Sequence, residues 1–354
     1  MKFIIFSDLH AHPYKEYSTS TSEGLNSRLQ DTLNVLQQIL DYCRIPNTWI
    51  DDAFFLGDLF HQRGRIHVET FNKVYGYLEK LADYPGLHLI AGNHDFTSKA
   101  LNESVLKTLR KIANVYEKPA TLIFDKDTED EVVVDVLPYC ESVEGLKFVS
   151  QKGKKYTRLL LGHVAVYGAV VGPNEFKPES PIKLPDLQLS RYWQIFLGHY
   201  HKKQQLRDNT WYVGSTLQQN WGERGNDNSF FVVDTKRKTV EQIPIKGPKF
   251  ILLDEINGID NDVVMKGVKG NFLRVLCREE DYHEKMREEF LERGALSVEF
   301  EIVPKVESVS RRLDIKLDSS WGEIIKKYVE NLPTVLNKPR LVKLGLEIFK
   351  EEET

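Results

Sequence analysis

The sequence predicts an α/β fold in which two packed β-sheets are flanked by helices, followed by a smaller α+β domain. Short apolar runs that end in a small residue recur through the first two hundred residues, and such runs are typical of buried strands. Segments with apolar residues at helical spacing lie between the first three of these runs, whereas the sequence after about residue 115 is rich in strands. Strands that first alternate with helices and then follow one another favour two layered sheets.

The expected elements follow the apolar patterns along the chain. Five apolar runs predict buried strands at 3–7, 53–57, 87–92, 159–162 and 195–198. Apolar residues at helical spacing predict helices at 26–43 and 67–82 and a shorter one at 102–113. Further strands are expected at 131–137, 211–213 and 229–233, and a loop at the polar stretch 17–22.

A domain boundary is expected near 246–248, Lys-Gly-Pro, after which no potential metal ligand follows an apolar run. We therefore predict a large domain at 1–246, a small α+β domain at 247–318 and a helical segment at 319–354. The small domain should contain strands at 271–277 and 296–303 around a charged helix at 279–293, and the last segment helices at 321–331 and 340–350.

The composition limits the class of protein. The chain has 354 residues, of which 41% are hydrophobic and 28% charged, and this is typical of a soluble globular protein. No stretch approaches the roughly 18 apolar residues of a membrane helix, and the first apolar run is too short for a signal peptide. Cys43, Cys140 and Cys277 lie far apart, so we expect a reducing, cytoplasmic environment. The net charge of −4 argues against avid DNA binding by the whole surface but allows a local basic patch.

Potential metal ligands follow each of the five apolar runs. They are Asp8 and His10 after the first run, Asp58 after the second, Asn93 after the third, His163 after the fourth, and His199 and His201 after the fifth. Side chains at the carboxyl ends of neighbouring strands can converge on one crevice. Residues two apart, such as Asp8 and His10, share one face of an extended backbone, so both can reach the same ion.

The chemistry of these groups indicates two metal ions. Carboxylate, imidazole and amide groups together suit a divalent ion such as Mn²⁺, Fe²⁺, Zn²⁺ or Mg²⁺. The absence of cysteine from the motifs argues against a structural zinc site. Because the motifs supply more groups than one ion normally takes, we expect two ions that share a bridging carboxylate.

Several residues in or beside the motifs have alternative roles. His61 can act near a substrate or only pack locally, and Asp95 can support its neighbour His94 or cap the following helix. Basic residues that follow the motifs can contact phosphates or be solvated loop charges. These basic residues are Arg63, Arg65, Lys99, Lys202 and Lys203. The histidines at 12, 67, 88 and 283 are expected in loops, in structural roles or in solvent.

The motifs, in this order, resemble those of the calcineurin-like metallophosphoesterase superfamily over roughly the first 240 residues. The segments Gly57–His61 (GDLFH), Tyr212–Ser215 (YVGS) and Trp221–Glu223 (WGE) look like the Mre11/SbcD family of DNA-repair nucleases, whose phage and bacterial members are of similar length. The resemblance implies a two-sheet metallophosphoesterase sandwich, and the small domain resembles the capping domain of that family.

The resemblance also implies a role for each motif residue. One ion would be held by Asp8, His10, Asp58 and His201, and the other by Asp58, Asn93, His163 and His199. His94 would act on the leaving group with support from Asp95, and His61 would lie near the scissile phosphate.

The implied activity is that of a two-metal DNA exonuclease, with endonuclease activity as a second mode, in DNA end processing, repair or recombination. Mn²⁺ is the ion expected to support it best, and the chain is expected to form a homodimer in a bacterial cell or a phage-infected host. The family acts beside a Rad50/SbcC-type ABC ATPase, which must come in trans because the chain has no G-x-x-x-x-G-K-[ST] loop. The helical segment at 319–354 is the expected docking site for it.

Two other functions are compatible with the sequence. An enzyme of the same fold could instead cleave small phosphodiesters or dephosphorylate proteins. A catalytically silent subunit that bridges DNA ends is the second alternative, and the complete ligand set argues against it.

Overall fold

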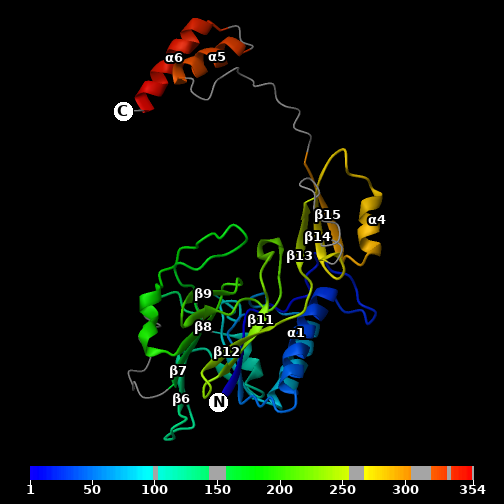
Figure 1. The fold of residues 1–354 in the computed structure, drawn as a ribbon, viewed down its shortest axis with the longest axis vertical. Coiled ribbons are helices and arrows are strands. Elements are labelled where there is room, and N and C mark those ends of the chain that lie inside the picture. Colours follow the sequence, from blue (N-terminus) through cyan, green and yellow to red (C-terminus); the bar gives the residue numbers. More distant parts are fainter. Residues whose placement is uncertain (99–102, 143–156, 255–266, 304–319, 333–335, 353–354) are drawn as a thin grey trace. The chain divides into compact units, whose positions relative to one another are not determined.

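The computed structural model describes residues 1–98, 103–142, 157–254, 267–303, 320–332 and 336–352 (Figure 1). The chain groups into two compact units. The first contains Met1–Cys277 and His283–Glu301, and the second Arg278–Tyr282 and Ile302–Thr354.

One six-stranded sheet of the first unit has the order β12-β11-β1-β2-β3-β4. Its strands are β1 (Lys2–Phe6), β2 (Asp52–Phe55), β3 (Gly86–Ile90), β4 (Asn114–Tyr116), β11 (Ser229–Asp234) and β12 (Thr239–Pro244). The four strands from β1 to β4 run parallel, and β11 is antiparallel to β1.

The other six-stranded sheet has the order β5-β6-β7-β8-β10-β9. Its strands are β5 (Ala120–Phe124), β6 (Val132–Leu137), β7 (Thr157–His163), β8 (Gln194–Gly198), β9 (Gln204–Arg207) and β10 (Thr210–Tyr212). The strands β6, β7, β8 and β10 run parallel, whereas β5 and β9 are antiparallel to their neighbours. Parallel strands present their carboxyl ends at a common edge, which suits a shared site.

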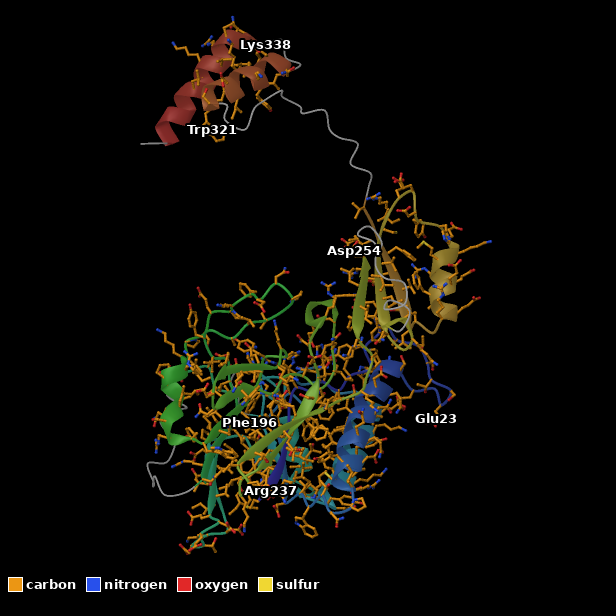
Figure 2. The ribbon with its side chains drawn as sticks, viewed as in Figure 1. Glu23, Phe196, Arg237, Asp254, Trp321 and Lys338 are labelled. Carbon is orange, nitrogen blue, oxygen red and sulfur yellow. The ribbon has the colours of Figure 1, made fainter. Side chains whose placement is uncertain are left out.

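The alternation of side chains along β1 shows how the two sheets stack. Phe3 and Ile5 are fully buried in a cluster with residues of the other sheet, among them Phe196 (Figure 2). Ile4 and Phe6 point the other way and pack with helices α1 (Ser27–Cys43) and α2 (Val68–Ala82). Because successive side chains of a strand face opposite sides, one strand serves both layers. The predicted class, two packed sheets flanked by helices, is confirmed.

Helix boundaries agree with the sequence in two cases and differ in one. α1 begins where Asn26 accepts a hydrogen bond from the amide of Leu29, a common helix start. The helix expected at 102–113 is wrong in type and length, because residues 105–109 form only a short 3₁₀ helix, η1 (Val105–Leu109). The chain then enters the edge strand β4, which pairs with β3 and ends the helical stretch. Three other 3₁₀ helices are η3 (Leu184–Leu187), η4 (Leu189–Arg191) and η5 (Trp221–Glu223).

A three-stranded sheet of order β13-β14-β15 completes the first unit, and we call it the small sheet. It consists of β13 (Phe250–Asp254), β14 (Phe272–Arg278) and β15 (Ser297–Val303), with α4 (Lys285–Glu292) between the last two. The helix expected at 279–293 is shorter than predicted, because the amides of Asp281 and Tyr282 bond back to the carbonyl of Arg278 in a turn. The domain boundary near residue 246 stays a prediction.

The second unit contains the two helices expected near the chain end. α5 (Trp321–Asn331) begins with a capping box formed by Ser320 and Glu323, and α6 is Lys338–Glu352. Gly345 lets the two helices approach, since a Cβ there would lie 2.9 Å from Cγ2 of Ile325. Within the described residues, none of the helices has the length and apolar character needed to span a membrane.

Candidate metal centre

The potential ligands follow strands of both six-stranded sheets and come together at one edge. Asp8 follows β1, Asp58 follows β2, and Asn93 follows β3. His163 is the last residue of β7, and His199 directly follows β8. The structure therefore brings the polar residues that follow the five apolar runs to a common edge of the two sheets.

Three of these side chains form what we call the His201 group: Asp8, His10 and His201. The Nε2 atoms of His10 and His201 lie 3.0 Å apart. Oδ1 of Asp8 lies 4.0 Å from Nε2 of His10 and 3.8 Å from Nε2 of His201. One carboxylate oxygen and two ring nitrogens therefore surround a point that an ion could occupy.

Three others form the His163 group: Asn93, His163 and His199. Oδ1 of Asn93 lies 3.0 Å from Nε2 of His163 and 2.8 Å from Nδ1 of His199. The rings of His163 and His199 meet edge to face, with centroids 5.3 Å apart. These atoms converge on a second point beside the His201 group.

Asp58 connects the two groups through a single oxygen. Its Oδ2 lies 3.5 Å from Nε2 of His10 and 3.5 Å from Nε2 of His163. Its other oxygen, Oδ1, accepts a hydrogen bond of 2.7 Å from the amide of His94. The carboxylate is thereby oriented so that Oδ2 faces both groups.

Hydrogen bonds to the outer ring nitrogens fix which nitrogen of each histidine faces the centre. Nδ1 of His163 lies 2.6 Å from the carbonyl of Leu56, and Nδ1 of His201 lies 2.7 Å from Oε1 of Glu223. A carbonyl or carboxylate oxygen only accepts, so Nδ1 donates in both cases and Nε2 faces inward. Such an arrangement is common around metal-binding histidines. Glu223 lies within a motif noted in the sequence, but nothing in its spacing indicated that it orients His201.

The backbone at the ligands is left-handed where an extended chain was expected. Asp8, His10, Asp58 and His199 have φ values of 52°, 46°, 62° and 98°. Asp8 and His10 therefore do not share a face of an extended strand as predicted, because β1 ends at Phe6. Unusual backbone of this kind is costly and concentrates at functional sites.

Glycines make room for this edge of the sheets. A Cβ on Gly92 would overlap the Asp58 carboxylate, and one on Gly57 would lie 2.5 Å from Nδ1 of His163. Gly57 also has a φ of 96°, a conformation that favours glycine. These two glycines therefore allow the backbone to approach the ligands closely.

Burial and neighbouring groups shift the pKa values of the residues in the centre in opposite directions. Burial works to raise the pKa of Asp58, but His163 holds that pKa below its usual range. Burial works to lower the pKa of His163, but Asp58 raises it to about 9. Burial likewise works to lower the pKa of His201, but the hydrogen bond with Glu223 raises it to about 9. The carboxylates thus attract positive charge to the inner nitrogens, which a metal ion could supply in place of protons.

The donor set fits divalent metal ions. Nε2 of a neutral His163 and Oδ1 of Asn93 are both acceptors at 3.0 Å, so a proton or a cation must lie between them. Nδ1 of His10 is buried, and no hydrogen-bond partner is found for it among the described residues. Imidazole, carboxylate and amide oxygen suit Mn²⁺, Fe²⁺, Zn²⁺ or Mg²⁺ rather than a soft ion.

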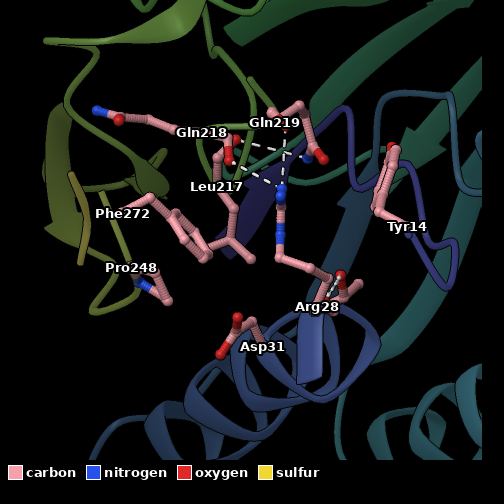
Figure 3. Close-up of a pocket in the computed structure, with 9 residues that line it drawn as sticks. Tyr14, Arg28, Asp31, Leu217, Gln218, Gln219, Pro248 and Phe272 are labelled. Atoms are coloured by element: carbon pink, nitrogen blue, oxygen red, sulfur yellow. Dashed lines mark hydrogen bonds between the residues drawn. The ribbon is translucent and has the colours of Figure 1, made fainter. Parts of the chain in front are cut away.

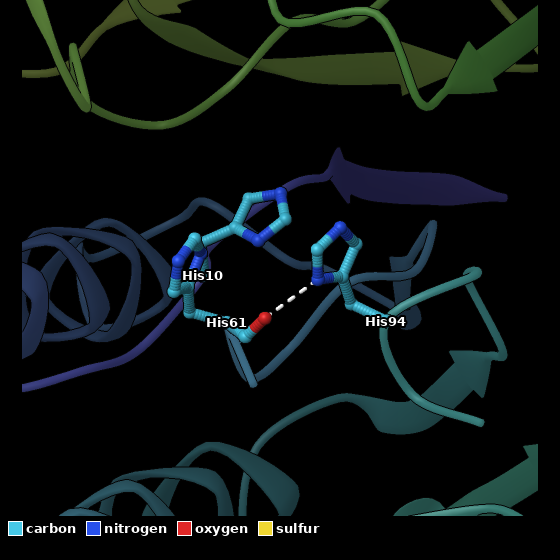
Figure 4. Close-up of side chains that lie close together, drawn as sticks. All are labelled: His10, His61 and His94. Atoms are coloured by element: carbon cyan, nitrogen blue, oxygen red, sulfur yellow. Dashed lines mark hydrogen bonds between the residues drawn. The ribbon is translucent and has the colours of Figure 1, made fainter. Parts of the chain in front are cut away.

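Two further histidines, His61 and His94, lie beside the centre, and one ring nitrogen of each lies within 4.8 Å of the other and of a ring nitrogen of His10 (Figure 4). The rings of His61 and His94 are stacked with centroids 5.8 Å apart, and His94 lies 4.9 Å from the ring of His10. Nδ1 of His94 lies 2.5 Å from the carbonyl of His61, so Nδ1 is the donor and Nε2 remains available. His12, expected only in a loop, lies 5.4 Å from the ring of His61.

Asp95 has a different contact from the one that the resemblance implied. Its carboxylate accepts hydrogen bonds from the amides of Asp58 and Gly92 at 2.8 Å and of Leu59 at 2.9 Å, and not from His94. Burial and the charge of Asp58 raise its pKa to about 7, although the three amides oppose this rise. Asp95 therefore holds the loops after β2 and β3 together, and it positions Asp58 rather than His94.

The basic candidates have unequal surroundings. Nζ of Lys202 lies 3.0 Å from Oε1 of Glu175, and burial lowers the pKa of Lys203. Arg63 is half-buried and Arg65 exposed in the loop after β2. Lys99 lies outside the described residues.

Two stacked, largely parallel sheets bring carboxylate, imidazole and amide groups to a common edge, an arrangement that suits a metal-dependent hydrolase. The chain belongs to the calcineurin-like phosphoesterase family, whose model matches residues 1–232.

Two viral proteins are similar in sequence. "Putative phosphoesterase 244L" of Invertebrate iridescent virus 6 is 21% identical over 261 residues, which cover 70% of this chain and 89% of that protein. "Putative phosphoesterase 078R" of Invertebrate iridescent virus 3 is 24% identical over 206 residues, which cover 56% of this chain and 57% of that protein. Nuclease MPE of Pseudomonas putida is a solved structure that is 15% identical, with 49% of this chain and 66% of that chain covered. The TM-score between the two structures is 0.26.

Proposed function

We propose that this chain is a two-metal-dependent nuclease that hydrolyses phosphodiester bonds of DNA, as an exonuclease and also as an endonuclease, in DNA end processing, repair or recombination. One observation carries the proposal of two ions: Oδ2 of Asp58 lies 3.5 Å from Nε2 of His10, in the His201 group, and 3.5 Å from Nε2 of His163, in the His163 group. The choice of DNA is supported by the resemblance of Gly57–His61, Tyr212–Ser215 and Trp221–Glu223 to Mre11/SbcD nucleases.

Each group would hold one ion. Asp8, His10 and His201 would hold the first, Asn93, His163 and His199 the second, and Asp58 would bridge them. Two divalent ions about 4 Å apart can bind a phosphate, lower the pKa of a bound water and stabilise charge in an in-line displacement. We propose Mn²⁺ as the ion that supports activity best, because both oxygen and nitrogen ligands are present.

His94 is the proposed proton donor to the leaving oxygen. Its Nδ1 donates to the carbonyl of His61, so only Nε2 can donate to a substrate, and it does so in the protonated ring. Cleavage of a phosphodiester creates an alkoxide that needs a proton, and general acid catalysis is typically worth about 10²–10⁴ in rate. His61, stacked on His94, would lie near the scissile phosphate.

The proposed substrate can be tested directly. End-labelled duplex and single-stranded DNA would be incubated with the protein and Mn²⁺, next to nucleotide diesters and phosphoserine peptides. We expect DNA to be shortened from its ends at rates well above those of the other substrates. Preferential turnover of nucleotide diesters or phosphopeptides would assign the site to a different phosphate ester. Bound metal without any turnover would favour the silent bridging subunit.

A partner is proposed for residues 319–354: a Rad50/SbcC-type ATPase, bound by a homodimer in the cytoplasm. The support is the resemblance and the large apolar side chains that α5 exposes, since Trp321 is 59% and Tyr328 57% accessible. Apolar stripes of a helix often occupy a partner groove. Deleting residues from 319 onward should leave metal binding intact and abolish co-purification with the ATPase. Full-strength ATPase binding by the shortened chain would move the docking site elsewhere.

A further inference from the structure

Arg28 is a buried cation that none of the motifs contains. It lies in the first turn of α1 and is only 6% exposed (Figure 3). Its guanidinium donates to backbone carbonyls, 3.0 Å to that of Gln219 and 3.5 Å to that of Gln218. A buried charge is costly unless it is well bonded, so these carbonyls and the arginine hold each other in place.

The segment that Arg28 holds leads directly to a metal-centre histidine. The amide of Gln219 donates to Oε2 of Glu223 at 3.0 Å, and Oε1 of Glu223 accepts from Nδ1 of His201 at 2.7 Å. Oε2 of Glu223 also accepts a hydrogen bond of 3.2 Å from the hydroxyl of Ser215. The segment that Arg28 holds and Ser215 therefore fix one oxygen of Glu223 together, and the other oxygen faces the ligand. Displacement of the Gln219 backbone would turn this carboxylate and with it the His201 ring.

Arg28 is also connected, through Tyr14, to His10, the other histidine of the His201 group. Its guanidinium lies 5.2 Å from the ring centroid of Tyr14. The hydroxyl of Tyr14 donates to the carbonyl of His10 at 3.2 Å. Both connections lead to the His201 group. The His163 group is instead oriented by the carbonyl of Leu56 at 2.6 Å.

The small sheet places two aromatic rings beside Arg28. The guanidinium lies 5.0 Å from the ring of Phe272 and 5.6 Å from that of Phe250, distances at which a cation is attracted to an aromatic ring. The amide of Phe250 donates to Oε1 of Gln218 at 2.8 Å. Trp221, in the 3₁₀ helix that carries Glu223, lies between the ring of Phe250 at 5.0 Å and the guanidinium of Arg274 at 4.3 Å.

We infer that Arg28 is a positioning residue that fixes the His201 group through Gln219 and Glu223 and makes this half of the metal centre depend on the seating of the small sheet. The inference rests on the proposal of two ions and does not depend on DNA as the substrate. It follows from the contacts of one side chain with the small sheet, with the 218–219 backbone and with Tyr14.

The test is a Mn²⁺ titration of purified full-length variants by calorimetry. Arg28→Met removes the charge and the hydrogen bonds but keeps an apolar stem of similar length. We expect one of the two ions to bind about 10–100-fold more weakly, which is the usual effect of losing support behind a metal ligand, and the other to bind as in the wild type. Arg28→Lys, which keeps a cation, should restore part of the lost affinity.

Two further variants separate positioning from general stability. Arg44→Met is the matched control, since Arg44 lies at the other end of α1, 5.2 Å from the ring of Tyr84 and away from the centre; it should leave both ions unchanged. Phe272→Leu, a change in the small sheet, should weaken the same ion as Arg28→Met, although to a smaller extent.

The metal affinities of these variants test the role of Arg28 even if one variant does not fold. If folded Arg28→Met binds both ions with wild-type affinity, or loses both equally, Arg28 has no specific role in the His201 group. If Arg28→Met does not fold, Arg28→Lys and Phe272→Leu carry the same test, and wild-type affinities in both would overturn the inference. Failure of the proposed function would look different, because a protein that cleaves no DNA would still show the selective change in metal affinity.

Discussion

The two halves of the metal centre are built differently. His163 is fully buried and bonds to the carbonyl of Leu56, directly after β2, so residues at the edge of the two stacked sheets position it. His201 is partly exposed and bonds to Glu223, in a segment that contacts Arg28 and the small sheet. The first half is therefore a property of the sandwich, whereas the second depends on later parts of the chain. Residues that orient a metal ligand change the affinity for the metal ion when they are lost. Substitutions elsewhere in the chain can therefore alter metal binding mainly in the second half.

Loss of Asp58 should have the largest effect, because Asp58 contacts both halves and its removal should weaken metal binding in both. Asp58→Ala removes the oxygen that lies 3.5 Å from Nε2 of both His10 and His163. We expect both ions to be weakened and activity to fall by at least about 10³-fold, since metal stabilisation of a transition state is worth several kcal/mol.

The control for Asp58→Ala is Asp52→Ala. Asp52 is a buried carboxylate at the start of β2, the strand that precedes Asp58, and it bonds to His88 at 2.9 Å, away from the centre. The Asp52→Ala substitution should lower the unfolding temperature but leave the number of bound metal ions unchanged. Unchanged activity in Asp58→Ala would contradict a bridging role.

His94→Gln should leave both halves intact and reduce catalysis. His94 contributes only its amide to Asp58 and is outside both groups. We predict a loss of about 10²–10⁴ in the rate of DNA cleavage, with both ions and DNA binding retained. The loss should be smaller for a nitrophenyl phosphodiester, whose leaving group needs little protonation. Equal losses on both substrates would make His94 a phosphate-binding donor, and loss of an ion would make it a ligand.

Glu223→Gln should affect one half selectively. The amide keeps the size of the side chain but removes the charge that accepts from His201 at 2.7 Å. We expect one ion to bind about 10–100-fold more weakly and the other to remain, as measured by metal analysis after dialysis. A uniform loss of both ions would show that the halves are not independent.

The smallest effects are expected from the basic residues. Lys202 is adjacent to His201 and already paired with Glu175 at 3.0 Å. Burial raises the pKa of Tyr139, whose ring stacks on that of His199, to about 12, and the nearby charge of Arg63 opposes this rise. Arg63→Ala should weaken DNA binding and reduce the salt slope by about 1, and Lys202→Ala by less. Binding measured at several salt concentrations would test this, and a larger effect of Lys202→Ala would reverse the order.

The sequence predicted what depends on local pattern. Buried parallel strands carry continuous apolar runs, so β1, β2, β3, β7 and β8 and the polar residues after them were found together. Short or charged helices were overestimated: 102–113 contains only η1 (Val105–Leu109), and 279–293 contains α4 (Lys285–Glu292). A helical period alone does not show where turns and edge strands end a helix.

What depends on distant contacts could not be predicted. Arg28 and Gln219 are 191 positions apart, and no spacing rule connects them. The bond of Glu223 to His201 and the three amides on Asp95 likewise arise only when loops from different strands meet. The left-handed backbone at Asp8 is a further feature that a motif does not show.

The proposal of two ions joined by Asp58 is tested most directly by anomalous scattering from crystals of the protein with saturating Mn²⁺. We predict two manganese peaks about 4 Å apart, one between Asp8, His10 and His201 and one beside Asn93, His163 and His199, with Oδ2 of Asp58 between them. A single peak at saturation, or two peaks that do not share Asp58, would contradict it.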